Sequence, residues 1–180
     1  VERIYANPKY RGKTVSPYWG TTVLAPGRNG KFARVCMEKG GYLCPEYYMA
    51  EQPTEAGARR LIQQRLGSAM LKREKSLPGC TPNLIIVLGG FSVLPDSLNH
   101  CPNVDFKVFL DLQMRFLATH PSFFGMGEVQ VYHTGYMDDE TVRWVGRLFR
   151  HYWIEGNTTP TTSDSYELTH IENPDFDYGL

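Results

Sequence analysis

No apolar stretch of this 180-residue sequence approaches the length of about 20 residues that a membrane-spanning helix requires. The start of the chain also lacks the charged, apolar and small-residue regions of a secretory signal peptide. We therefore expect an intracellular protein that does not associate with membranes. Because the chain begins with Val1 rather than Met, we expect it to be an excised or processed piece of a longer protein.

Cysteine is scarce and forms no recognisable motif. No two cysteines stand at the two-residue spacing of a zinc or redox site, and no histidines lie beside them at ligand spacing. We expect buried thiols rather than disulfides, and the sequence predicts neither a metal site nor a cofactor. The four cysteines are Cys36, Cys44, Cys80 and Cys101.

The motifs of common enzyme classes are also missing. There is no phosphate-binding loop, no dinucleotide-binding glycine pattern and no Gly-x-Ser-x-Gly nucleophile turn, although Ser92 follows a predicted strand. Residues 136–139 spell the Tyr-Met-Asp-Asp tetrapeptide of reverse-transcriptase active sites, where paired carboxylates hold two metal ions. Since helix-forming sequence follows it, we interpret Asp138 as a helix cap. The sequence therefore predicts no catalytic residue.

Net charge is zero, but the charges are unevenly distributed. Residues 1–80 hold 14 Lys and Arg against 6 Asp and Glu, whereas residues 81–180 hold 5 against 13. The basic half suits an anionic partner and the acidic half a basic one. The alternative is that the two halves neutralise each other.

The most apolar segment, residues 84–88, contains five branched aliphatic residues without alternation. This pattern is typical of a strand buried on both faces, under helices. Gly89 and Gly90 follow it, where the backbone is free to turn sharply or to let a ligand approach. Ligands of open α/β sheets bind beyond the carboxyl ends of the strands. Residues 89–99 are therefore the first place to expect a binding site, and an ordinary turn is the alternative.

Strand-like and helical patterns alternate along the chain. This alternation predicts an α/β fold with a Rossmann-like, mostly parallel central sheet and helices on both faces. The predicted organisation is a lead-in segment over 1–20, the domain over 21–157, and an acidic tail over 158–180 that is mobile or docked on a missing neighbour. Strands are predicted at 21–25, 84–88 and 128–133, with a further short one to which residues 42–44 lead, and helices are predicted at 31–39, 55–75, 104–118 and 138–154.

The order of these elements resembles the MID domain of Argonaute proteins together with the linker that precedes it. The likeness covers most of the chain and is one of pattern rather than of a single motif. The segments that carry it are Pro8 to Lys13 with Trp19, Phe32 to Gly41, the apolar run at 82–88, and Val145 to Asn157.

MID domains bind the 5′-phosphate and first base of a small guide RNA, using a Tyr and a Lys on one helix, a Gln after it and a Lys on the last helix. The resemblance places Phe109 at the position of the stacking Tyr and Gln113 at that of the Lys, so the chain departs from the family pattern at both. Loss of the lysine weakens phosphate binding unless Arg115 or Lys107 substitutes for it. The implied RNA-binding residues are Gly90, Phe91, Phe109, Gln113, Arg115, Gln130, Arg147 and His151.

Independently of the resemblance, Arg147 and His151 stand four residues apart on one predicted helix, an arrangement that suits a phosphate. The alternative is a solvated basic face. We expect a non-catalytic module that anchors the 5′ end of a small guide RNA in an RNA-silencing protein of the cytoplasm or nucleus. Its partners would be the guide RNA and the neighbouring domains of that protein. The alternatives are a hydrolase-like enzyme that uses the crevice at residues 89–92, and a protein-interaction module.

Overall fold

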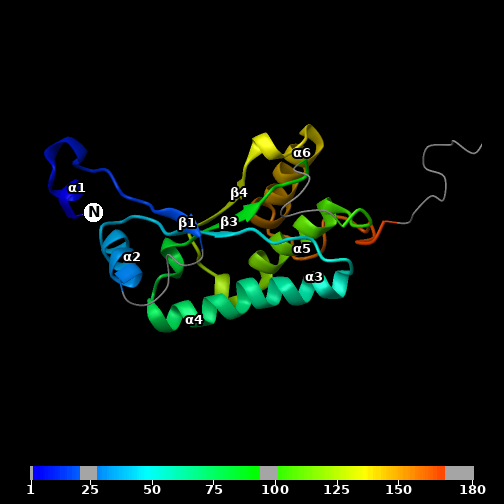
Figure 1. Cartoon of the computed structure of the whole chain (residues 1–180), viewed down its shortest axis with the longest axis horizontal. Coiled ribbons are helices and arrows are strands. Elements are labelled where there is room, and N and C mark those ends of the chain that lie inside the picture. The colour runs from blue at the N-terminus through cyan, green and yellow to red at the C-terminus, as the bar shows by residue number, and fades with distance from the viewer. Residues whose placement is uncertain (1, 21–27, 94–100, 169–180) are drawn as a thin grey trace, which may run out of the picture.

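The computed structural model describes residues 2–20, 28–93 and 101–168 of the chain (Figure 1). In this part of the chain four parallel strands form one sheet, and their order across the sheet is their order in the sequence. The predicted α/β class with a parallel sheet is confirmed. The strand expected at 21–25 lies outside the described residues. The strands are β1 (Tyr18–Gly20), β2 (Cys44–Tyr47), β3 (Ile85–Gly89) and β4 (Glu128–Tyr132).

Helices connect the strands and follow the last one. Among the described residues, no helix has the length and apolar character needed to cross a membrane. The α-helices are α1 (Glu2–Ala6), α2 (Arg28–Glu38), α3 (Glu55–Ile62), α4 (Ser68–Ser76), α5 (Phe106–Thr119) and α6 (Asp139–Phe149). Two π-helical segments, η3 (Gln63–Gly67) and η7 (Arg150–Ile154), extend α3 and α6. The 3-10 turns are η1 (Pro8–Tyr10), η4 (Thr81–Asn83), η5 (Pro121–Phe123) and η6 (Thr134–Tyr136).

The helix predicted over 55–75 is confirmed as a continuous run of α3, η3 and α4, which we call the α3–α4 helix (Figure 1). Its buried aliphatic side chains recur every four residues. On a regular α-helix each such step rotates the stripe by about 40° beyond a full turn, so the stripe would wind away from the core. The wider π-helical turn of η3 offsets this rotation. The stripe comprises Ala58, Ile62, Leu66 and Met70.

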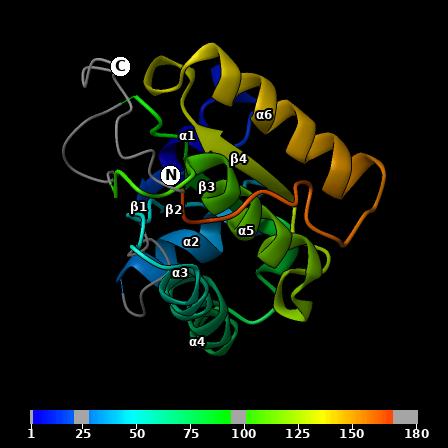
Figure 2. The same cartoon turned by 90° about the vertical axis from the view of Figure 1, so that its right-hand side faces the viewer.

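The helices α2, α3, α4 and α5 lie on one side of the sheet (Figure 2). Right-handed crossovers that step each time to the next strand in the same direction place their helices on the same face. Crossover helices that lie on alternate faces go with a reversal of the strand order, and the described strands show no reversal. Ligand crevices of open α/β sheets form at such reversals. The described part of this sheet therefore has no crevice of that kind.

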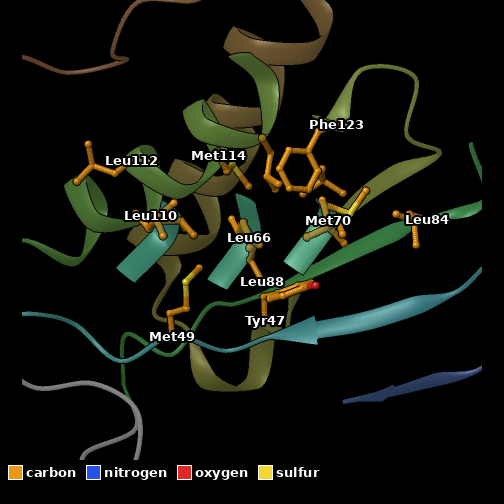
Figure 3. Close-up of a cluster of buried hydrophobic side chains, with 14 of the residues drawn as sticks. Tyr47, Met49, Leu66, Met70, Leu84, Leu88, Leu110, Leu112, Met114 and Phe123 are labelled. Atoms are coloured by element: carbon orange, nitrogen blue, oxygen red, sulfur yellow. The ribbon is translucent and has the colours of Figure 1, made fainter. Parts of the chain in front are cut away.

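The sheet face under these helices carries the main core (Figure 3). Ile86 and Leu88 of β3 are fully buried there, in one cluster with Leu66 of the α3–α4 helix and Met114 of α5. Burial of side chains of this size is the main source of folding free energy. The core therefore joins the strands to the long helices.

The opposite face of the sheet is covered differently in the described residues. Cys44, Ile85 and Val87 are buried there in a small cluster with Tyr48 and Tyr132, and no helical side chain takes part. Tyrosines of the sheet and its loops thus cover this cluster. All five residues of β3 are buried, which confirms the prediction of a strand buried on both faces.

Two terminal segments that were predicted to lie outside the domain pack against it. The lead-in segment contributes β1, which pairs with β2. Residues 158–168 of the predicted acidic tail, which we call the strap, dock on the chain itself rather than on a missing neighbour. Tyr166 is buried, and its hydroxyl donates to the Gln52 carbonyl at 2.7 Å. Leu168 N donates to the Asn103 carbonyl at 2.8 Å.

Replacing Ile86 by Ala should lower the free energy of unfolding by about 2–5 kcal/mol, because it leaves a cavity in the main core. Leu71→Ala is the matched control, since Leu71 is 62% exposed on the α3–α4 helix, and it should change the value by no more than about 0.5 kcal/mol. Urea denaturation measures both. Equal losses in the two variants would contradict this assignment of the core.

Candidate functional site

Phe109 and Gln113, the two α5 residues that the resemblance implied, lie in the core. Phe109 is fully buried with its ring edge-on to Phe106 and Tyr166. Gln113 is 1% exposed, its Nε2 donates to the Phe109 carbonyl at 3.3 Å, and its Oε1 has no hydrogen-bond partner among the described residues. In this structure neither side chain faces a pocket that a base or phosphate enters.

Gly90 and Phe91, at the start of the loop after β3, are closely packed, and residues 94–99 of the expected binding region lie outside the described residues. A Cβ atom on Gly90 would lie 2.6 Å from the Met137 Sδ and 2.7 Å from the Val131 Cγ1, so a larger residue would force these side chains to move. Phe91 is 4% exposed and sits edge-on to Tyr48, with ring centroids 5.0 Å apart. Phe91 also forms part of the wall of a pocket of about 170 Å³, which is lined in addition by Glu51, Ser92, Cys101, Pro102, Val104 and Phe106.

Ser92 helps to start α6. Its Oγ accepts a hydrogen bond from Asp138 N at 3.2 Å and lies 3.5 Å from the Asp138 carboxylate. Asp138 in turn accepts from Thr141 N at 2.6 Å, and this bond holds the pKa of the carboxyl below its usual value. The interpretation of Asp138 as a helix cap is confirmed. Ser92 is thus tied to a helix terminus rather than to a general base.

Arg115 and His151 hold the strap in place. Arg115 Nε donates to the Thr158 carbonyl at 2.9 Å, and His151 Nε2 lies 2.9 Å from the Thr159 carbonyl. These bonds fix the chain as it leaves η7 and turns back over α5. Arg115 and His151, which the resemblance implied as RNA-binding residues, therefore bind the backbone of the strap in this structure.

Asp111 anchors the same segment from inside the protein. It is 3% exposed and accepts hydrogen bonds from the Tyr152 hydroxyl and from Thr161 N, the latter at 2.9 Å. Burial raises the pKa of the Tyr152 phenol and the Asp111 hydrogen bond raises it further, so Tyr152 stays a donor at ordinary pH. Sequence analysis missed Asp111, although an acid between two buried leucines of a predicted helix was a usable signal.

The end of the strap borders a pocket of about 300 Å³, which we call the α5–α6 pocket. Trp144 forms part of its wall and is held in place by the bond from its Nε1 to the Lys107 carbonyl at 2.9 Å. The Arg147 guanidinium lies over the indole, 5.4 Å from the ring centroid. The lining residues are Lys107, Glu140, Arg143, Trp144, Arg147, Thr162 and Asp164.

The α5–α6 pocket holds more positive than negative groups, and its ion pairs are weak. Lys107 Nζ lies 2.8 Å from the Glu140 carboxylate, but that carboxylate side chain is 72% exposed. Arg143 lies 4.0 Å from Asp139, and both side chains are largely exposed. Exposed pairs of this kind contribute about 0–1 kcal/mol. A phosphate entering the pocket can therefore replace these carboxylates as the partner of the cations.

Of the eight residues that the resemblance implied, only Arg147 lines the α5–α6 pocket. Gln130 lies on the sheet face that carries the tyrosines, where its Nε2 donates to Glu128 at 3.4 Å. Sequence analysis named Lys107 as a possible substitute for the missing lysine but missed Trp144, which the fold brings into the same pocket as Arg147. The implied residues do not form one site in this structure.

A comparison of the chain with protein-family models, with curated proteins and with solved structures found no match. In the described ranges no three His, Cys, Asp or Glu side chains are arranged to hold a metal ion. Cys36, Cys44 and Cys80 are buried free thiols, as predicted, and Cys101 is a half-buried one.

Replacing Tyr152 by Phe should lower the free energy of unfolding by about 1–3 kcal/mol, because the buried Asp111 carboxylate loses a donor. The strap should also become more susceptible to limited proteolysis. Tyr42→Phe, at a 40% exposed tyrosine, is the control and should have little effect. Equal behaviour of the two variants would show that the strap does not depend on Asp111.

The charged cap of α6 makes a pH-dependent contribution to stability. Because the folded-state pKa of Asp138 is lowered, this contribution is complete above the unfolded-state pKa and disappears as pH falls through the folded-state value. Asp138→Asn keeps a capping side chain without the charge. The difference in unfolding free energy between the native chain and this variant should shrink between pH 7 and pH 2. A difference that stays constant over this range would contradict the assignment.

Proposed function

We propose that the chain is a non-catalytic nucleic-acid-binding module that holds the 5′-phosphate and first base of a small guide RNA in the α5–α6 pocket. The observation that supports this proposal is the convergence of Lys107, Arg143 and Arg147 on a pocket whose wall includes a half-buried tryptophan. The module would act in the cytoplasm or nucleus as part of a larger RNA-silencing protein.

The phosphate would bind to the cations of the pocket. Arginine presents several N–H groups in a plane that matches phosphate oxygens, and lysine adds a point charge. Arg147 makes no ion pair with a carboxylate in the described part of the chain, so its outward N–H groups are available. The hydrogen bond to Glu140 raises the pKa of Lys107, which keeps that side chain charged at neutral pH.

The first base would stack beside the phosphate. RNA bases stack on aromatic rings and on guanidinium planes, and Trp144 and Arg147 offer one of each. The hydrogen bond from Trp144 to α5 fixes the indole before any ligand arrives, which lowers the entropy that binding costs. Trp144 and Lys107 would thus take the roles that the resemblance implied for Phe109 and Gln113.

Titration of 5′-phosphorylated and 5′-hydroxyl RNA of the same sequence tests this proposal. The phosphorylated RNA should bind at least about tenfold more tightly, since a charge-assisted hydrogen bond is worth about 1.5–3 kcal/mol. Arg147→Gln and Lys107→Gln should each reduce this preference. Arg150→Gln makes the same change of charge one turn away and outside the pocket, so it should retain the preference.

Equal binding of the two RNAs by the native chain would overturn the proposed function. A preference that survives both pocket substitutions would show that the phosphate binds elsewhere. Circular dichroism of each variant establishes that a lost preference is not a folding defect.

A further inference from the structure

The outward side of the α3–α4 helix is the most basic continuous element in the described part of the chain. Arg59 is paired with Glu55, but no carboxylate forms an ion pair with the other four exposed cations among the described residues. Glu74 is the other acid of this helix, and it accepts the hydrogen bond from Gly79 N at 2.7 Å. The four unpaired cations, which we call the basic ridge, are Arg60, Arg65, Lys72 and Lys75.

The fold keeps the basic ridge pointing outward. Because η3 corrects the rotation of the buried stripe, Leu66 and Met70 stay in the core while Arg65 and Lys72 are exposed beside them. From Arg60 to Lys75 the helix advances about 22 Å, at 1.5 Å per residue. Four unpaired positive charges along this length raise the local electrostatic potential and attract a polyanion.

We propose that the basic ridge binds the sugar-phosphate backbone of RNA, at a distance along the strand from the 5′ end held in the α5–α6 pocket. This inference takes its ligand from the proposed function. It assigns a separate surface whose contacts are electrostatic and independent of sequence.

A second feature favours a single strand with accessible bases over a flat anionic surface. A pocket of about 270 Å³ lies between the α3–α4 helix and α5, where the helix lines it with Ile62, Gln63 and Arg59, which is next in sequence to Arg60 of the ridge. Its apolar floor includes Leu112 and the half-buried ring of Phe116, and Arg115 stands at its edge. An aromatic ring beside guanidinium groups suits an unstacked RNA base. A lipid headgroup has no part that needs such a pocket.

The salt dependence of RNA binding tests the basic ridge. The variant Arg65→Gln/Lys72→Gln/Lys75→Gln removes three of its charges at exposed positions, where substitutions leave stability nearly unchanged. The control Lys9→Gln/Arg11→Gln/Lys13→Gln removes three exposed charges from the lead-in segment. Dissociation constants for 5′-phosphorylated and 5′-hydroxyl single-stranded RNA are measured at several salt concentrations.

In the ridge variant both RNAs should bind more weakly, and the slope of log K against log salt should fall in magnitude by about 2. The preference for the 5′-phosphate should remain, and the control should retain the native slope. Equal slopes in the native chain and both variants would overturn the role of the ridge while leaving the proposed function intact. A reduced slope in the ridge variant without any phosphate preference would overturn the proposed function and retain the ridge.

The remaining alternative is that the basic ridge binds an anionic membrane surface, and binding to phosphatidylserine vesicles tests it. RNA binding that does not depend on the ridge, together with vesicle binding that does, would overturn the inference in favour of a membrane surface. The inference predicts that the ridge substitutions weaken the binding of RNA more than the binding of vesicles.

Discussion

The strand order is the constraint on which the rest of this structure depends. Four parallel strands that follow one another in sequence order require crossovers that all step the same way, and their helices therefore share one side of the sheet. This arrangement leaves the described sheet without the reversal at which α/β proteins usually bind ligands. The α5–α6 pocket gathers three cations, and four exposed cations of the first half of the chain lie on the outer side of the α3–α4 helix.

A buried carboxylate shapes that pocket from within. Asp111 draws in both Tyr152, at the end of the last helix, and the backbone of the strap at Thr161. A carboxylate this deeply buried is costly unless donors surround it. Once they do, the strap has a fixed path over α5. That path brings Thr162 and Asp164 to the edge of the α5–α6 pocket, so a core interaction determines the outline of a surface site.

Local patterns in the sequence predicted the local parts of the fold. The stripe of the α3–α4 helix, the apolar run of β3 and the cap at Asp138 each depend on residues a few positions apart, and all three are confirmed. What sequence reasoning did not predict depends on contacts between distant segments. The pairing of β1 with β2 and the docking of the strap are of this kind.

In the candidate site, too, the residues recognisable from the sequence depend on local patterns, and the others depend on contacts between distant segments. Arg147 was recognisable from its basic surroundings on one helix. Lys107 belongs to another helix and meets Trp144 only through the packing of α5 against α6, which no spacing in the sequence records. Phe109 was assigned by alignment to a family pattern, but its position on the apolar stripe of α5 places it in the core. For this residue the apolar periodicity of the helix predicts the environment of the side chain better than the resemblance to the family does.

The resonance of the Trp144 indole N–H is the most direct test of the central claim, because that group bonds to α5 at the wall of the proposed site. In a spectrum of nitrogen-labelled protein, 5′-phosphorylated RNA should shift this resonance in a saturable way. The same RNA with a 5′-hydroxyl group should shift it at much higher concentration. Saturable RNA binding that leaves the Trp144 resonance unchanged would contradict the account.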